Sequence, residues 1–177
     1  NPEGSISGID SVDKGYNLIT IGASAGIAKG GDSLAGAVVV NVVDSAATAW
    51  IGDKNAASET TTVLADGSVN VLAADKFGVL SIGGSLGLSG KAKQDSSNQG
   101  NTTGQKSTSV GGVLSVNVIH ATSDAYMSHV TVGGKTNQGP DVSVTSLSKQ
   151  QILAIAGAAA AAQGDAYAVT VAVNVIS

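Results

Sequence analysis

Two histidines and one aspartate form the only local cluster in the chain whose side chains could ligate a metal ion. They are His120, Asp124 and His129. On an extended strand, His120 and His129 differ in parity and would point to opposite faces. In the repeat described below, the residue that matches His120 is Asp44 in one copy and Ser177 in another. Chemistry that changes between copies favours solvated side chains at a corner, so the sequence predicts no metal site.

Carboxylates could support glycoside hydrolysis, which generally needs two of them about 5 to 10 Å apart. Glu occurs only at Glu3 and Glu59, and most Asp residues stand in turn-like sequence, where their side chains cap backbone groups. Examples are Asp44, Asp66, Asp75 and Asp141. All nine basic residues are Lys, so the bidentate clamp that Arg offers a carboxylated sugar is missing. We expect a non-catalytic protein without a cofactor, and keep a carbohydrate-active enzyme as the weakest alternative, since adjacent strands could still pair two Asp residues.

The composition argues against several classes of partner. The formal net charge is −4, which leaves no electrostatic footprint for nucleic acid. There is no Cys, hence no disulfide framework or thiolate metal site. No apolar run reaches the roughly 18 to 20 residues of a membrane-spanning helix, so we expect no membrane insertion by this segment. The ending "VAVNVIS" stops inside a motif that continues elsewhere, and we interpret the chain as a fragment of a longer protein.

The best candidate for an interaction surface is a polar insertion, Gly90 to Gly112, which is rich in Ser, Thr, Asn, Gln and Gly. Loops that project from a rigid scaffold often carry binding functions. A tolerated, disordered insertion is the competing interpretation. The same two interpretations, a binding loop or a tolerated insertion, apply to the loop from Gly52 to Asp66. The candidate contact residues in the insertion are Lys91, Lys93, Asn98, Asn101, Thr102 and Lys106.

Three kinds of short segment recur in constant order, and they are the elements that must position all these side chains. "VVVNVV", "VLSVNVI" and "VAVNVI" align Asn41, Asn117 and Asn174, and "TAWI" and "DAYM" follow in the first two copies. A second set begins at Leu18, Val79 and Ile152, and a third begins at Gly67 and Pro140. Each segment alternates with period 2 between turn residues, which is typical of strands. Repetition of this kind indicates one repetitive unit over residues 1–177.

Short Val-rich strands without a crossover helix predict an all-β fold, and long sequence repeats favour a β-solenoid over a sandwich or barrel. With roughly 20 to 25 residues per coil, the fragment would hold about seven or eight coils over some 35 Å. The scarcity of aromatic residues predicts a thin interior of small and β-branched side chains. The Ala-rich segment after Gln150 has high helix propensity, yet its alignment with a Gly- and Ser-rich copy predicts a strand at Ile152–Ala156.

The repeat also suggests which side chains lie inside. Positions that share parity with Val116 and Val118 are consistently Val or Leu, so we expect that face to be interior. The three Asn residues would then lie on the other face or at a bend, and an inward Asn ladder is the alternative. Trp50 and Tyr126 share a repeat position, for which we expect a corner that covers the end of the core, with an exposed binding stripe as the alternative.

The order "GSVNVLAAD", "VLSIGGSLG" and "GGVLSVNVIHATSDAYM" resembles the repeated passenger regions of large type V-secreted bacterial adhesins, the autotransporter and filamentous-haemagglutinin-like proteins. The resemblance covers nearly the whole chain from about Leu18. It implies a right-handed parallel β-helix, exported across the outer membrane and displayed on the cell surface or secreted. It also implies a structural stalk or display segment of a virulence-related adhesin.

Three alternatives of function stay open beside the stalk. The segment could bind a host-cell surface protein or glycan directly through the 90–112 loop, belong to a secreted toxin passenger, or act on carbohydrate. The open ends of a solenoid are sticky edges, so end-to-end self-association is a further expectation.

Overall fold

All regular structure in the described part of the chain is β-strand. The computed structural model describes residues 16–55, 59–90, 106–134 and 139–177. The strands are β1 (Leu18–Lys29), β2 (Ser33–Gly52), β3 (Thr61–Leu64), β4 (Val69–Gly90), β5 (Ser109–Ser128), β6 (Val130–Gly133), β7 (Val142–Ala161) and β8 (Ala166–Ile176). The all-β prediction is confirmed. The strand predicted at Ile152–Ala156 is also confirmed, because it lies within β7 in spite of its Ala content.

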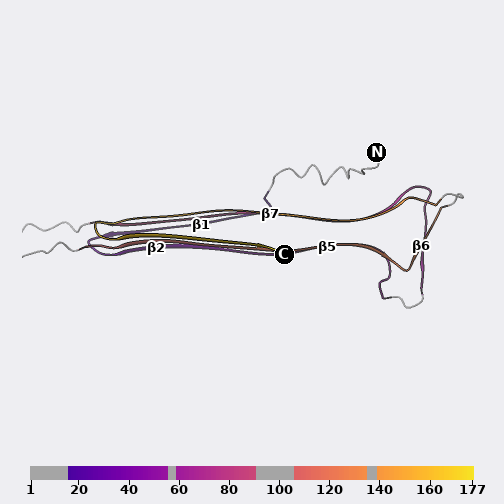
Figure 1. Cartoon of the computed structure of the whole chain (residues 1–177), viewed down its shortest axis with the longest axis horizontal. Helices are drawn as coiled ribbons and strands as arrows, with labels where there is room; N and C mark the ends of the chain where they lie inside the picture. Colours follow the sequence, from indigo (N-terminus) through magenta and orange to yellow (C-terminus); the bar gives the residue numbers. More distant parts are fainter. Residues whose placement is uncertain (1–15, 56–58, 91–105, 135–138) are drawn as a thin grey trace, which may run out of the picture.

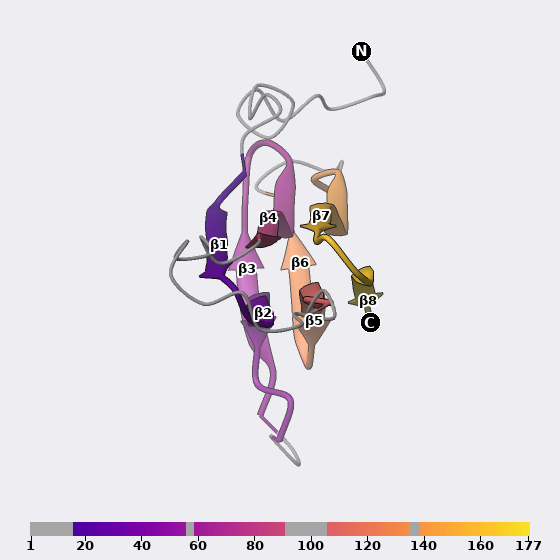
Figure 2. The same cartoon turned by 90° about the vertical axis from the view of Figure 1, so that its left-hand side faces the viewer.

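The strands form three parallel sheets that the chain visits in turn. Sheet A has the order β1-β4-β7, sheet B the order β2-β5-β8, and sheet C consists of β3 and β6. Sheets A and B lie face to face, and sheet C crosses one end of the pair (Figure 1). Figure 2 looks along the long strands and shows the row β1, β4 and β7 of sheet A above the row β2, β5 and β8 of sheet B. Each pass of the chain therefore adds one strand to sheet A and one to sheet B beside the strands of the previous pass, and the first two passes also add one strand each to sheet C.

Like residues stand beside like residues at the aligned positions of sheets A and B, as the repeat alignment predicts. In sheet B, Asn41 pairs with Asn117, which pairs with Asn174. In sheet A, the second set of segments is aligned through Leu18, Val79 and Ile152. The third set is aligned through Val69 and Val142. The sequence repeat is thus a register of parallel strands.

One pass of the chain through the sheets is much longer than the coil of roughly 20 to 25 residues that the sequence predicts. The segments at Val69 and Val79 were expected as separate strands, yet both belong to the 22-residue β4. In the same way, β5 runs without a break from the Asn117 segment through Tyr126. The described chain consequently makes three long passes, which stack over only about 10 Å, while a 20-residue strand extends over roughly 65 Å. The expected seven or eight coils over 35 Å are wrong.

The interior between sheets A and B is thin, as the composition predicts. A Cβ atom added to Gly22 would lie 2.6 Å from Val39 Cγ2, and one added to Gly83 would lie 2.6 Å from Val113 Cγ1. A Cβ atom on Gly111 would lie 2.5 Å from the carbonyl oxygen of Ala159 in sheet A. Such approaches leave room only for Gly, Ala or Ser at many inward positions.

The two faces of the long strands are the reverse of what the constancy of Val suggested. In β2 the residues from Ser33 to Asn41 alternate strictly between buried and exposed, and Asn41 is on the buried side. Val38 and Val42 are 68% and 73% exposed, whereas Asn117 is fully buried in β5. The inward Asn ladder is therefore correct, and the outward assignment is wrong. Small and hydrogen-bonding side chains occupy the interior because the sheets approach too closely for a continuous layer of larger ones.

A tight corner joins sheet B to sheet C in each of the first two passes. It contains Gly52, which has a φ of 91°, and His129, which has a φ of 53°. An added Cβ on Gly52 would collide with the Ser128 carbonyl group and lie 2.7 Å from Val130 Cγ2. Both the backbone conformation and the space require glycine at Gly52.

Candidate functional site

The most ordered polar feature in the interior is a chain of side-chain amides along the stack. Asn41 Nδ2 donates to Asn117 Oδ1 at 2.7 Å, and Asn117 Nδ2 donates to Asn174 Oδ1 at 2.8 Å. The hydroxyl of Thr20 in sheet A donates to Asn41 Oδ1 at 2.6 Å, and Asn117 Nδ2 also lies 3.2 Å from Ser115 Oγ. We call Asn41, Asn117 and Asn174 the amide ladder.

The chemistry of the amide ladder is structural. Its amides are uncharged and neither take up nor release a proton near neutral pH, so they offer no general acid or base. What they supply is one hydrogen bond per pass, in a register that any slip of one residue would destroy. Because each buried amide has partners, the ladder also satisfies the rule that buried polar groups are hydrogen-bonded.

A second polar region lies nearer sheet C, where hydroxyl groups bridge sheets A and B. Ser45 Oγ donates to Asp75 Oδ1 at 2.9 Å, and Ser123 Oγ donates to the Ala73 carbonyl at 3.1 Å. Asp75 is only 9% exposed, and its Oδ2 has no hydrogen-bond partner within the described residues. Asp44 and Asp75 both lie inside strands, β2 and β4, so their expected turn positions are wrong. A single carboxylate among hydroxyls is not the pair that glycoside hydrolysis requires.

The histidines of the candidate metal cluster are on the outside of the molecule. His120 is exposed on β5, with Nδ1 3.2 Å from Ser177 Oγ. His129 lies at the corner after β5, with Nδ1 3.0 Å from Ser128 Oγ and 3.1 Å from the carbonyl of Asp53. Among the residues that the structure describes, no group of three or more His, Cys, Asp or Glu side chains is placed to hold a metal ion.

Trp50 and Tyr126 stack on neighbouring strands, which confirms that they share a repeat position. Their ring centroids are 6.4 Å apart with an interplanar angle of 13°, and Lys54 Nζ lies 4.8 Å from the centre of the Tyr126 ring. Trp50 is 58% exposed on the outward side of β2, so it does not cover the end of the core as expected. The pair forms a small exposed aromatic step, where stacking and a cation–π contact stabilise the edge of sheet B.

Most candidate residues of the polar insertion lie outside the described residues. These are Lys91, Lys93, Asn98, Asn101 and Thr102, whereas Lys106 is described and exposed. β5 already begins at Ser109, so the last residues of the 90–112 interval belong to a strand. In the other loop, Thr61–Leu64 forms β3 and pairs with β6 in sheet C.

The outward faces of sheets A and B are the feature that the sequence analysis missed. We define outer face A as the outward side chains of β1 from Ile19 to Ile27 with their partners in β4 and β7. Outer face B consists of the outward side chains of β2 from Leu34 to Val42 with their partners in β5 and β8. All outward positions in both faces are apolar or Gly, except for Tyr167 at the end of outer face B. The signal was present as period-2 runs of Ile, Leu and Val, but it was assigned to the interior.

Comparison with known proteins finds no relative: no family model, no curated protein and no solved structure matches this chain. The described residues also contain no helix long and apolar enough to cross a membrane. The geometry itself must therefore carry the functional argument.

Proposed function

We propose that this chain is a non-catalytic structural segment, a stiff stalk or display scaffold built as a parallel β-solenoid. The observation that carries the proposal is the unbroken register of like residues in sheets A and B. In such a stack each pass bonds to the next through its backbone, and the amide ladder adds a side-chain bond in the same direction. Force along the stack is then shared by many hydrogen bonds that act in parallel.

A right-handed winding fits this proposal. The chain leaves β1, crosses through sheets B and C, and returns beside β1 as the parallel strand β4. Crossover connections between parallel strands of one sheet are right-handed in about 98% of cases. The same hand is implied by the resemblance to type V-secreted adhesins.

Surface display on a bacterial cell is the setting that we propose for the scaffold. It rests on the resemblance of the repeated segments to adhesin passenger regions, and the exposed Trp50–Tyr126 step and the polar insertion would then be carried outward by the stalk. Host-cell proteins or glycans are the partners that such a parent protein would meet. The amide ladder and the thin interior need no cofactor to hold them.

Two experiments test the proposal at its two levels. Hydrogen exchange should protect the amides of β4 and β5, the central strands of sheets A and B, more strongly than those of β7 and β8. Equal and fast exchange of the central and last strands would contradict the scaffold. Antibodies against the 177-residue chain should label intact cells of the organism that encodes it. Labelling only after permeabilisation would contradict surface display.

A further inference from the structure

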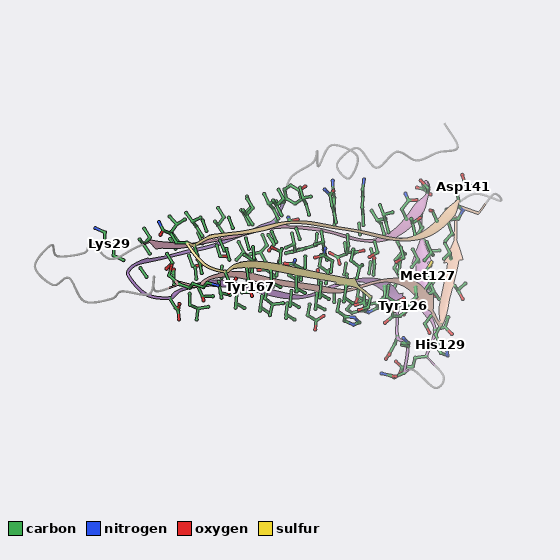
Figure 3. All side chains as sticks on the ribbon, turned by 60° about the vertical axis from the view of Figure 1, so that its left-hand side comes forward. Lys29, Tyr126, Met127, His129, Asp141 and Tyr167 are labelled. Atoms are coloured by element: carbon green, nitrogen blue, oxygen red, sulfur yellow. The ribbon has the colours of Figure 1, made fainter. Side chains whose placement is uncertain are left out.

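Outer faces A and B are unusually apolar for surfaces that face water. On outer face B, Leu34, Val38 and Val42 are 78%, 68% and 73% exposed. On outer face A, Ile21 and Ile27 are 69% and 73% exposed. A contiguous apolar patch of this kind marks a site of association. Figure 3 shows side chains projecting away from both sheets along most of their length.

The charges that border the two faces have opposite signs. Every charged residue at an outward position of β1, β4 or β7 is a lysine, namely Lys29, Lys76 and Lys149. Every charged residue at an outward position of β2, β5 or β8 is an aspartate, namely Asp44 and Asp124. The only other titratable side chains at outward positions of these sheet B strands are His120, Tyr126 and Tyr167. Outer face A is therefore basic at its borders, and outer face B is acidic.

The opposite charges stand at matching places along the strands. Ser45 and Asp75 meet across the interior at 2.9 Å. Their chain neighbours Asp44 and Lys76 point the other way, so they mark the same position on the two outer faces. Lys149 is the partner of Lys76 in sheet A, whereas Asp124 lies four residues beyond the partner of Asp44 along β5, roughly 13 Å nearer sheet C. At the other end, Lys29 and Asp32 flank the turn that joins β1 to β2.

We propose that copies of this chain associate laterally, with outer face A of one copy packed on outer face B of the next. A simple translation perpendicular to the sheets brings the apolar areas together and sets the Lys76–Lys149 border against Asp44. The same translation brings Lys29 near Asp32. Packing A on A would oppose lysines, and B on B would oppose aspartates, so charge complementarity selects the A-on-B arrangement. Such a contact is heterologous and open, and it produces rows of copies rather than closed dimers.

The size of the contact predicts concentration-dependent assembly. The apolar part of each face spans nine residues and three strands, roughly 30 by 14 Å, or about 850 Å² counted over both partners. The bordering charges add to this area, which brings the contact near the lower end of specific interfaces. We therefore expect monomers at low concentration and elongated rows at high concentration, with assembly weakened by salt. This lateral association goes beyond the scaffold role and differs from stacking at the open sheet edges.

Charge reversal on exposed outward residues tests the proposal without disturbing the fold. One variant carries Lys29→Glu and Lys149→Glu on outer face A, and the other carries Asp44→Lys and Asp124→Lys on outer face B. A control, Glu59→Lys with Asp141→Lys, makes the same charge change as the outer face B variant, at exposed residues outside both faces. Circular dichroism and unfolding midpoints confirm that each variant folds, and sedimentation velocity measures assembly of the 177-residue chain.

We expect each variant alone to assemble poorly and the mixture of the two variants to assemble again. Each variant alone needs about tenfold more protein, or still more, to assemble than the unaltered chain, because the reversed side chains face like charges across the contact. An equimolar mixture recovers assembly, since the reversed outer face A of one variant complements the reversed outer face B of the other, and the two unaltered faces complement each other as they do in the unaltered chain. The control behaves like the unaltered chain. Assembly that ignores both reversals would indicate edge stacking and overturn the proposal, as would a chain that stays monomeric but floats with phosphatidylcholine vesicles.

Discussion

Replacement of Asn117 by Leu should destabilise the protein more than replacement of all three ladder residues together. Asn117 is fully buried at the centre of the ladder, where it accepts from Asn41 and donates to Asn174. Asn117→Leu leaves the Asn41 amide, which is 5% exposed, without its acceptor. Asn174 is exposed on the last pass, so water can replace its lost donor.

The magnitude follows from which groups lose a partner. An unsatisfied buried polar group costs about 1–3 kcal/mol, and each lost hydrogen bond about 1 kcal/mol in net stability. Asn117→Leu should therefore cost about 2–4 kcal/mol in the free energy of unfolding. In the triple variant Asn41→Leu, Asn117→Leu and Asn174→Leu, no amide is left without a partner. Only the half-buried Thr20 hydroxyl loses its acceptor, so the triple variant should cost less than the single one.

Equilibrium unfolding in urea measures both values, and an unchanged slope would show that only stability has changed. Measurement at low protein concentration keeps association out of the comparison. The reasoning is refuted if Asn117→Leu costs less than about 0.5 kcal/mol, which is the usual effect of a surface substitution. It is refuted equally if the triple variant costs the sum of three independent losses, because residues of one network should be non-additive.

Three further predictions use matched positions or single contacts. Gly111→Ala should lower the free energy of unfolding by about 2 kcal/mol, because its new Cβ meets the Ala159 carbonyl. Gly112→Ala is the control: its Cβ would have no neighbour within 4 Å, so the free energy should change by less than about 0.5 kcal/mol. Equal costs of the two variants in urea unfolding would contradict the close approach of the sheets. Asp75→Ala should lower stability by about 1 kcal/mol in the same assay, because Ser45 Oγ then loses the oxygen to which it donates; an unchanged free energy of unfolding would show that this hydrogen bond contributes nothing. Fluorescence from Trp50, the single tryptophan, should be quenched by acrylamide almost as readily in the folded chain as in urea, because its ring is exposed. Strong protection from quenching at low protein concentration would contradict this and place the ring between the sheets.

The register of the fold could be predicted from the sequence because the repeats preserve residue type at each stacked position. Asn41, Asn117 and Asn174 are identical, and the segments at Leu18, Val79 and Ile152 are similar enough to be aligned by eye. Parallel stacking of passes brings such positions side by side, so the alignment is also a contact map. The pairing of strands could therefore be predicted from the alignment of the repeats alone.

The lengths of the strands could not be predicted from turn signals. Asp75 and Gly78 suggested a break within β4, and Ser123 with Asp124 suggested one within β5. In the structure the strands continue through these residues, because Asp75 accepts a hydrogen bond from Ser45, and Ser123 donates to the Ala73 carbonyl. Contacts across the interior thus satisfy side chains that would otherwise favour turns.

The predicted orientation of the strands is wrong because Val is constant on the outward face of this fold and not on the buried one. The alternate positions carry a better signal: Ser81, Gly83, Ser85, Gly87 and Ser89 are all small. Uniformly small residues at every second position indicate a face that another sheet approaches closely. Outer faces A and B then follow, and with them the surfaces from which lateral association is inferred.

The most direct test of the in-register stack is chemical bridging between neighbouring passes, which the absence of native Cys allows. Asp44 pairs with His120, and Thr48 pairs with Asp124, all at outward positions of β2 and β5. Dibromobimane, which fluoresces once it has joined two nearby thiols, should bridge Asp44→Cys with His120→Cys, and Thr48→Cys with Asp124→Cys. These partners are about 5 Å apart between backbones.

The crossed pairs provide the control with the same four residues. Asp44→Cys with Asp124→Cys, and Thr48→Cys with His120→Cys, are offset by four residues, which separates their backbones by about 14 Å. The account predicts intramolecular bridging in both matched pairs and in neither crossed pair. Efficient bridging of the crossed pairs, or of all four equally, would contradict the parallel register of like residues on which the fold and the proposed scaffold depend.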